Sequence, residues 1–280
     1  MSDFDRNMAP APFGGSMSRA EAAAIDAGLR AYMLHVYNYM VLGLAITGLA
    51  ALGIYLLAVT GSIENAAYVL RGKGVLPATV GMAVRSGDIL LTQIGYAVFF
   101  SPLKWVIVFA PLGLVFLLSF GIERMRPATA QLVFWIYCAL VGLSLGAIFL
   151  VFTHTSIVRV FFITAASFGA LSLWGYTTQR DLTGMGSFLM MGLVGIIIAS
   201  LVNMFLASSM LQFIVSIIGV LVFAGLTAWD TQRLKNDYIY GYASQGGEIA
   251  EKAAITGALS LYLNFINLFT LLLQLLGQRD

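Results

Sequence analysis

The chain has 280 residues, of which 60% are hydrophobic and only 10% are charged. Soluble domains carry about 25% charged residues, so this composition excludes an ordinary water-soluble fold and favours a protein that uses the lipid bilayer as its solvent. The net charge of +2 provides no basic surface for nucleic acid. The single cysteine, Cys138, excludes an intramolecular disulfide and a cysteine-based metal cluster.

Residues 1–30 are predicted to form a polar cytoplasmic tail. They carry acidic and basic residues throughout and lack the apolar core of a secretory signal. Prolines and glycines predict disorder in the first half, and Ser18 with Glu21 forms a capping box that begins a short helix leading into the membrane. We therefore divide the chain into this tail and a membrane domain, residues 31–280.

Apolar runs long enough to cross a bilayer as helices recur through the membrane domain. They are continuously apolar, whereas the strands of a membrane barrel alternate, so we expect an all-α membrane protein with seven spans. The uncharged run from Leu182 to Trp229 is too long for one span and is divided at 207–209. The predicted spans are 33–59, 104–122, 130–152, 157–177, 187–206, 211–233 and 253–276. A long first loop, 61–101, separates the first two spans, and its uncharged part, Ile89 to Leu103, is predicted to lie at the membrane surface or to lead into the second span.

The distribution of Lys and Arg predicts the orientation of the chain. With the N-terminus in the cytoplasm, the inside segments hold nine basic residues, including Arg124, Arg180 and Lys252. Apart from the long first loop and Lys104 at its border, the outside segments hold only Arg159 and Arg279. Seven spans then place the C-terminus outside.

Asp230 is the ionisable residue predicted to lie deepest in a span, near the end of the sixth. A charged group within a bilayer must face the protein interior or water. One interpretation is a carboxylate at the membrane surface that pairs with Arg233 or Lys235. We prefer a gating or proton-linked carboxylate that faces the bundle, because residues three or four apart form a partly small and polar stripe: Ser216, Gly219, Phe223, Thr227 and Asp230.

The seventh span carries a second polar face, made of Gly257, Ser260, Asn264, Asn267 and Gln274. Lipid would not tolerate this face, so it must point at other helices. It serves either for hydrogen bonds between helices or as the lining of a water path or ion site, and both alternatives stay open. Arg124 ends the second span on the same side as Asp230, where it forms a latch with that carboxylate or acts simply as a positive stop signal.

Several segments together resemble one known family. Its first, fourth, sixth and seventh helices resemble segments here that begin at Tyr32, Thr164, Ala228 and Ala258: YMLHVYN, TAASFGALSLWGYTTQRDL, AWDTQ and ALSLYLNFINLF. On these motifs the chain is similar to the bacterial branch of the transmembrane Bax-inhibitor motif family, from about residue 30 to 277. The resemblance implies a bundle in which the last helix is central and wrapped by the other six, in a bacterial inner membrane.

The resemblance also implies a function. The characterised bacterial relative is a pH-sensitive calcium leak, and other bacterial relatives modulate a membrane-bound AAA protease. The family's sensor is a pair of aspartates in its sixth and seventh helices, locked by an arginine from its second helix. By position these are Asp230, Asn264 and Arg124, so the second aspartate is an asparagine here. An Asp–Asn pair keeps oxygen ligands for calcium but loses the shared proton of two carboxylates, which predicts weaker calcium binding and a blunted or shifted pH response.

We therefore expect a cation leak gated near Asp230, with Asn264 and Arg124 at the gate and Thr227, Ser260 and Asn267 as its supporting polar face. The alternatives are a membrane interaction protein that modulates a AAA protease without an ion path, and a transporter for a small solute. An enzyme is not expected, because the sequence has neither a G-x-S-x-G elbow nor an H-E-x-x-H motif. No cofactor is expected beyond calcium as the permeant ion. The sequence does not indicate an oligomeric state.

Overall fold

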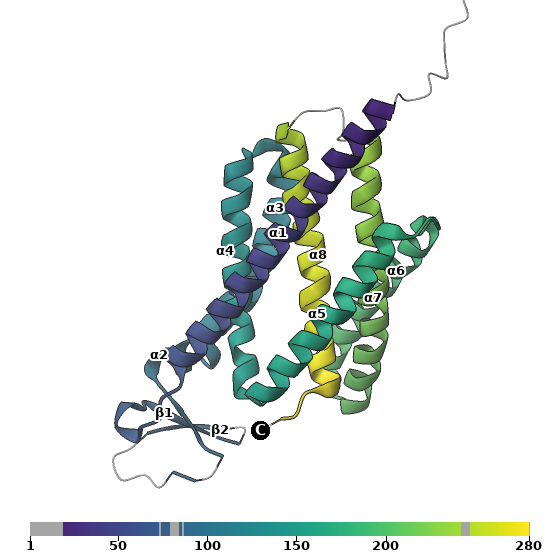
Figure 1. The fold of residues 1–280 in the computed structure, drawn as a ribbon. Helices are drawn as coiled ribbons and strands as arrows, with labels where there is room; N and C mark the ends of the chain where they lie inside the picture. Colours follow the sequence, from purple (N-terminus) through teal and green to yellow (C-terminus); the bar gives the residue numbers. More distant parts are fainter. Residues whose placement is uncertain (1–18, 73, 79–83, 86, 242–246, 280) are drawn as a thin grey trace, which may run out of the picture.

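A computed structural model describes residues 19–72, 74–78, 84–85, 87–241 and 247–279 (Figure 1). The first 18 residues, including the expected disordered stretch and Ser18 of the capping box, lie outside the described residues. The described helices are α1 (Arg19–Ala58), α2 (Gln93–Phe99), α3 (Leu103–Gly121), α4 (Pro127–Leu145), α5 (His154–Thr177), α6 (Thr183–Leu206), α7 (Ser209–Tyr240) and α8 (Gly247–Leu276). Three strands, β1 (Tyr68–Arg71), β2 (Gly74–Pro77) and β3 (Ile89–Leu91), lie between α1 and α2.

Within the described residues, seven helices are long and apolar enough to cross a membrane, which confirms the predicted fold class. They are α1 and α3 to α8, since α2 has only seven residues. Several helices extend beyond the predicted spans: α1 begins at Arg19, α7 continues to Tyr240 and α8 begins at Gly247. The reason is that apolarity marks only the part of a helix inside the hydrocarbon, whereas backbone hydrogen bonding continues through the charged turns beyond it.

The first loop contains a small antiparallel sheet that the sequence did not lead us to expect. Its strand order is β2-β1-β3, with Tyr68 opposite Pro77 on one side and opposite Leu91 on the other. Val69 and Leu91 are fully buried in it. The strands have only three or four residues each, too few for the alternation of polar and apolar residues to be recognised in the sequence.

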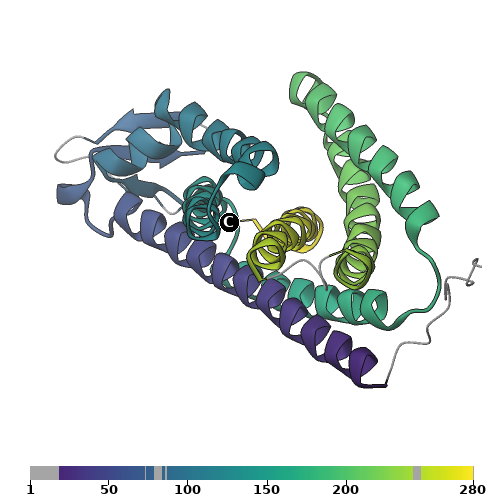
Figure 2. The same ribbon diagram turned by 90° about the horizontal axis from the view of Figure 1, so that it is seen from above.

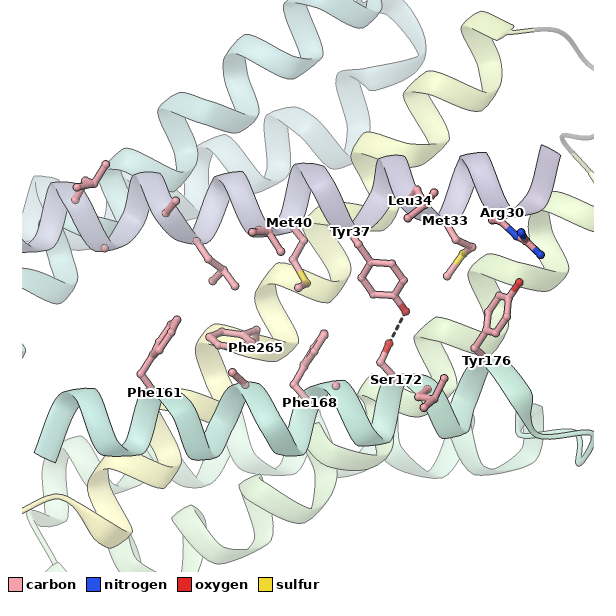
Figure 3. A pocket seen from close by; sticks show the side chains of 18 of the residues that line it. Arg30, Met33, Leu34, Tyr37, Met40, Phe161, Phe168, Ser172, Tyr176 and Phe265 are labelled. Atoms are coloured by element: carbon pink, nitrogen blue, oxygen red, sulfur yellow. Dashed lines mark hydrogen bonds between the residues drawn. The ribbon is translucent and has the colours of Figure 1, made fainter. Parts of the chain in front are cut away.

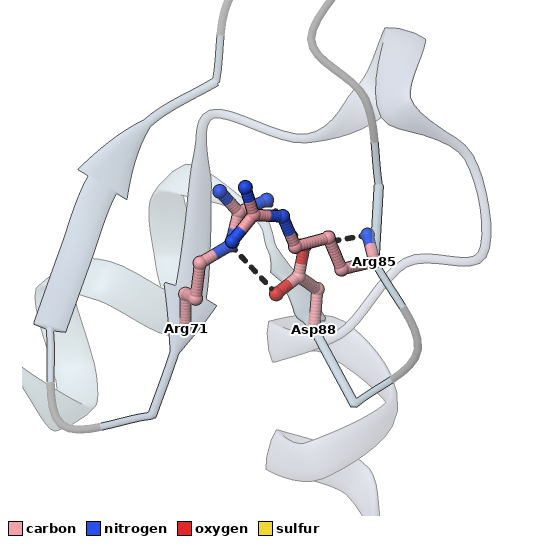
Figure 4. A network of polar contacts seen from close by, with 3 residues as sticks. All are labelled: Arg71, Arg85 and Asp88. Atoms are coloured by element: carbon pink, nitrogen blue, oxygen red, sulfur yellow. Dashed lines mark hydrogen bonds and ion pairs between the residues drawn. The ribbon is translucent and has the colours of Figure 1, made fainter.

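An ion pair attaches the segment before β3 to strand β1 (Figure 4). Arg71 donates from Nε to Oδ1 of Asp88 at 2.9 Å and from Nη2 to Oδ2 at 2.6 Å, and the backbone N–H of Arg85 donates to Oδ2 at 2.8 Å. These donors favour the ionised carboxylate and lower the pKa of Asp88 to about 2. The contact ties together residues that are 17 positions apart in the chain.

Helix α8 lies inside the bundle, as seen along the bundle in Figure 2. It packs against α1, α4, α5 and α7, while α3 packs on α4 and α6 packs on α7. The central position expected for the last helix is confirmed. Four of the other six helices pack against it, whereas α3 and α6 lie outside these four. A peripheral helix exposes apolar side chains to lipid at no cost, and α6 accordingly exposes Phe188, Met191 and Phe205.

Closely packed side chains join α8 to α1 and α4. The rings of Phe134 and Tyr262 are almost completely buried and meet edge to face. Beside them the hydroxyl of Thr47 lies 2.9 Å from the Cys138 carbonyl, to which it donates, and 2.6 Å from the Tyr262 hydroxyl. Gly142 allows α4 to approach α1, because a Cβ there would lie 2.5 Å from the Thr47 carbonyl oxygen.

Candidate functional site

The predicted carboxylate, Asp230, points into the protein. It lies on α7 about 32 Å along the helix axis from Ser209, by the rise of 1.5 Å per residue, and only 6% of its surface is exposed. Helix α7 begins at a cap in which the Ser208 side chain accepts from the N–H of Leu211. The neighbours of Asp230 on the same helix, Thr227 and Thr231, are fully buried and donate to backbone carbonyls one turn earlier.

Asn264 of α8 faces this carboxylate across the helix interface. Its Nδ2 donates to Oδ2 of Asp230 at 2.7 Å, and the asparagine is 5% exposed. Close approach of the two helices is helped by Gly257, because a Cβ there would lie 2.7 Å from the Leu234 side chain. The structure thus joins the polar stripes of the sixth and seventh spans, and the carboxylate of the former meets the amide of the latter.

The positive partner of Asp230 is Arg233, one turn later on the same helix. Its Nη2 lies 3.0 Å from Oδ1 of the carboxylate, and its guanidinium lies 4.8 Å from the centre of the Trp229 ring. The side chain of Arg233 is 39% exposed, so this ion pair lies at the boundary between the buried site and its surroundings. The two oxygens of Asp230 therefore have different partners, a guanidinium and an amide.

Arg124 does not form the expected latch with Asp230. It lies in a 3-10 turn after α3 (Ile122–Arg124), where its side chain is exposed. Among the described residues the carboxylate of Asp230 forms its salt bridge with Arg233 instead. Arg233 lies three positions after Asp230 on the same helix, so the two side chains lie on the same face of α7. Arg124 lies at the end of another helix and would have to reach across to Asp230.

A cavity of about 710 Å³ opens beside this pair, between α6, α7 and α8. One wall is the polar face of α8, and the opposite wall is the apolar face of α6 together with Ser200. The residues of the polar wall are Ser260, Asn264, Asn267, Thr270 and Gln274. Of the supporting residues that were predicted, Ser260 and Asn267 line this cavity, whereas Thr227 is buried inside the helix contact and does not.

The far end of the cavity holds a network that joins Gln274 and Ser216, which the sequence singled out, to two amides that it did not, Gln212 and Asn203. Gln212 donates from Nε2 to Oε1 of Gln274 at 2.5 Å, and the hydroxyl of Ser216 donates to the same oxygen at 2.9 Å. Asn203 donates to Gln212 at 3.0 Å. Gln212 and Asn203 are single amides near the ends of apolar runs, a signal that becomes interpretable only when the helices are placed together.

The oxygens along this cavity suit brief contact with a cation better than permanent binding. A calcium ion takes six to eight oxygen ligands, usually with several carboxylates. In the part of the chain that the structure describes, no group of three or more Asp, Glu, His or Cys side chains could hold a metal ion. The cavity instead offers one carboxylate and then hydroxyl and amide oxygens, arranged one after another along its length. They do not surround a single point as the ligands of a bound ion do.

Comparisons with known proteins extend over nearly the whole chain. A model of the family described as inhibitor of apoptosis-promoting Bax1 matches residues 29–280. The uncharacterized protein RP147 of Rickettsia prowazekii is 46% identical over 91% of this chain and 92% of its own length. A protein of Caulobacter vibrioides is 42% identical over 99% of this chain and 98% of its own length. The inner membrane protein YbhL of Escherichia coli is 40% identical, over 90% and 94%.

Proposed function

The chain belongs to the Bax inhibitor family of multi-pass membrane proteins, and we propose that it is a cation leak whose closed state is held at Asp230. The observation that carries this proposal is a buried carboxylate that borders a cavity lined on its α8 side by several hydroxyl and amide side chains. Purely structural polar residues in a membrane are usually satisfied within a helix contact. Here Asn264 and Gln274 bond to α7, but together with Ser260 and Asn267 they also line the cavity.

The pair of Asp230 and Arg233 accounts for a closed state. A guanidinium 3.0 Å from the carboxylate neutralises the only negative charge on the cavity wall. A cation that arrives from the Gln274 end would meet no net attraction at Asp230 until Arg233 moves away. Because Arg233 is partly exposed and lies at the end of the cavity, its side chain can swing outward without unfolding α7. Opening is thus a side-chain movement in this proposal.

Calcium is the permeant ion that we favour, since the oxygens of Asp230, Asn264 and Gln274 are hard ligands. The asparagine at position 264 keeps an oxygen near the carboxylate without a second charge. Two facing carboxylates would share a proton and change their joint charge with pH. In the Asp–Asn pair this coupling is absent, and we propose that the leak responds only weakly to pH. No catalysis is involved in this function.

Flux measurements in proteoliposomes test the proposal through two substitutions with opposite effects. Asp230→Asn leaves the charge of Arg233 uncompensated, so we expect cation flux to fall about tenfold, the change that about 1.4 kcal/mol in barrier height produces. Arg233→Gln frees the carboxylate and should raise flux by a similar factor. Asn264→Asp should introduce a pH dependence between pH 6 and 8 that the unmodified protein lacks.

The matched control is Glu123→Gln, which removes one exposed carboxylate outside the cavity and should leave flux unchanged. If Asp230→Asn and Arg233→Gln both conduct like the unmodified protein, no ion path passes this pair. That result would favour the alternative role, an interaction protein that modulates a membrane-bound AAA protease. An unchanged pH profile in Asn264→Asp would reject the proposed effect of the asparagine.

We propose a bacterial inner membrane as the location, with the N-terminus in the cytoplasm and the C-terminus outside. One support is the similarity to an inner membrane protein. The other is that Lys and Arg are concentrated in the segments that lie on the same side of the membrane as the N-terminus. In this orientation the small sheet lies outside and the pair of Asp230 and Arg233 lies toward the cytoplasm. Reporter fusions at the C-terminus and in the α3–α4 connection distinguish the two orientations.

A further inference from the structure

A large cavity lies away from Asp230, in a groove between α1 and α5 (Figure 3). Its volume is about 1150 Å³, and its lining is almost entirely apolar. Along α1 the lining runs from Arg30 to Leu52, which at 1.5 Å per residue is about 33 Å and matches the hydrocarbon thickness of a bilayer. The groove therefore extends over the whole depth of the membrane.

The groove is bounded by α1 on one side and by α5 on the other, and α8 contributes to its lining. Phe265 of α8 lies between the two helices in Figure 3, and the hydroxyl of Tyr37 on α1 meets that of Ser172 on α5 at 2.5 Å. Gly48 and Gly169 face the groove, and a Cβ at either position would have no protein atom within 4 Å. The space is thus available to a ligand rather than filled by side chains.

The end of the groove nearest the N-terminus is positively charged. Arg30 of α1 and Tyr176 of α5 lie there on opposite sides (Figure 3). Lys235 of α7 donates to the Tyr176 carbonyl at 3.0 Å and lies 5.2 Å from the centre of its ring. Neither cation forms a salt bridge with any carboxylate among the described side chains, although Asp26 lies one turn before Arg30.

We propose that this groove binds one anionic phospholipid from the leaflet at the N-terminal end of α1. Its phosphate lies at Arg30, with Lys235 nearby behind Tyr176, and its acyl chains follow the groove past Met33 and Phe168. A basic side chain at a membrane surface attracts an anionic headgroup, and an apolar channel that begins at Arg30 is complementary to a molecule with one charged end and a long apolar remainder.

The rim of the groove favours a lipid over another helix. Leu34, Val41 and Leu49 project from α1 with 56%, 57% and 71% of their surface exposed. Helices that associate in membranes meet through small residues, which let their backbones approach closely. Gly48 and Gly169 face this groove, but the large side chains on its rim would hold the backbone of a second helix away from them. Acyl chains are flexible and fit between large, uneven side chains. A second copy of the chain is therefore the less suitable occupant, and a dimer that Gly169→Leu dissociates would reveal it.

Native mass spectrometry of the purified full-length protein tests the site with phosphatidylglycerol and phosphatidylcholine as the added lipids. We expect the unmodified protein to retain phosphatidylglycerol more tightly. Arg30→Gln should weaken that binding about fivefold, the contribution of one basic residue near a membrane surface, and leave phosphatidylcholine unchanged. Gly169→Leu should weaken the binding of both lipids, because its side chain occupies the groove.

Two matched variants serve as controls. Arg126→Gln removes an exposed arginine outside the groove, and Gly113→Leu adds the same side chain at an open position on α3. Both should bind lipid like the unmodified protein. Equal retention of the two lipids by the unmodified protein, or equal behaviour of Arg30→Gln and Arg126→Gln, would overturn the proposal. It would also be overturned if Gly169→Leu dissociated a dimer at every lipid concentration.

Discussion

Helix α8 has two faces that differ in almost every physical respect. Its packed face, formed by Ala258, Leu261, Tyr262 and Phe265, is at most 3% exposed and meets the side chains of the neighbouring helices. Its cavity face, formed by Ser260, Asn264, Asn267 and Gln274, is polar and borders the cavity between α6, α7 and α8. One helix thus carries the centre of the hydrophobic core and the wall of the candidate ion path.

Under the proposed function, this difference separates the residues that hold the helices together from those that would contact the ion. In lipid the burial of apolar surface does not by itself drive helix association, so packing density and hydrogen bonds hold the helices together. The packed face provides both. The cavity face gives up packing and leaves polar groups beside open space, an arrangement expected where a solute must pass. Substitutions on the two faces should therefore affect different measurements.

The largest expected effect comes from filling the close contact between α1 and α4, beside the packed face. In Gly142→Leu the new side chain meets the carbonyl of Thr47, since a Cβ would already lie 2.5 Å from that oxygen. We expect a loss of about 3 kcal/mol in unfolding free energy, at the upper end of overpacking effects, measured by thermal unfolding in detergent. Gly195→Leu, at an open position on α6, should unfold like the unmodified protein. Equal stability of the two variants would mean that α1 and α4 are not closely packed.

A smaller effect is expected from a single hydroxyl. Tyr262→Phe removes the hydrogen bond to Thr47 at 2.6 Å without changing the shape of the core, so unfolding free energy should fall by about 1 kcal/mol while cation flux stays the same. The matched change on the cavity face is Asn267→Leu, whose amide donates only to the Leu263 carbonyl of its own helix. That variant should reduce flux with little change in stability. If Tyr262→Phe changed flux as much as Asn267→Leu, the two faces would not be functionally separate.

The smallest effect concerns the sheet between α1 and α2. This sheet belongs to neither face of α8 and therefore serves as a comparison for both. The pKa of Asp88 is lowered to about 2 by Arg71 and by the backbone N–H of Arg85. A lowered pKa means that the ion pair stabilises the sheet above pH 4 and that this contribution is lost as pH falls toward 2. Hydrogen exchange of β1 and β3 should therefore stay constant between pH 6 and 8 after correction for the intrinsic rate. A change in protection within that window would show that another group controls the sheet.

Much of the architecture followed from the order of apolar and charged residues. The seven spans were predictable, because continuous apolar runs in lipid have no alternative to helix. The interior orientation of Asp230 was also predictable, since its stripe and that of Asn264 both required a protein neighbour. The sheet at 68–91 was not, because its pairing depends on contacts between short segments. The ion pair of Arg71 and Asp88 is of the same kind, since it joins residues 17 positions apart.

From the order of residues alone it follows that this chain has seven apolar spans and that one carboxylate and one line of amides must avoid lipid. The residues left Arg233, Lys235 and Arg124 as partners for that carboxylate, and the placement of the helices selects Arg233. The tertiary structure also decided that the amides of α8 border a cavity and that α1 and α5 leave a groove between them. The physical reason is that solvent preference depends on each residue's own chemistry, whereas partners and voids depend on how whole helices are placed against one another.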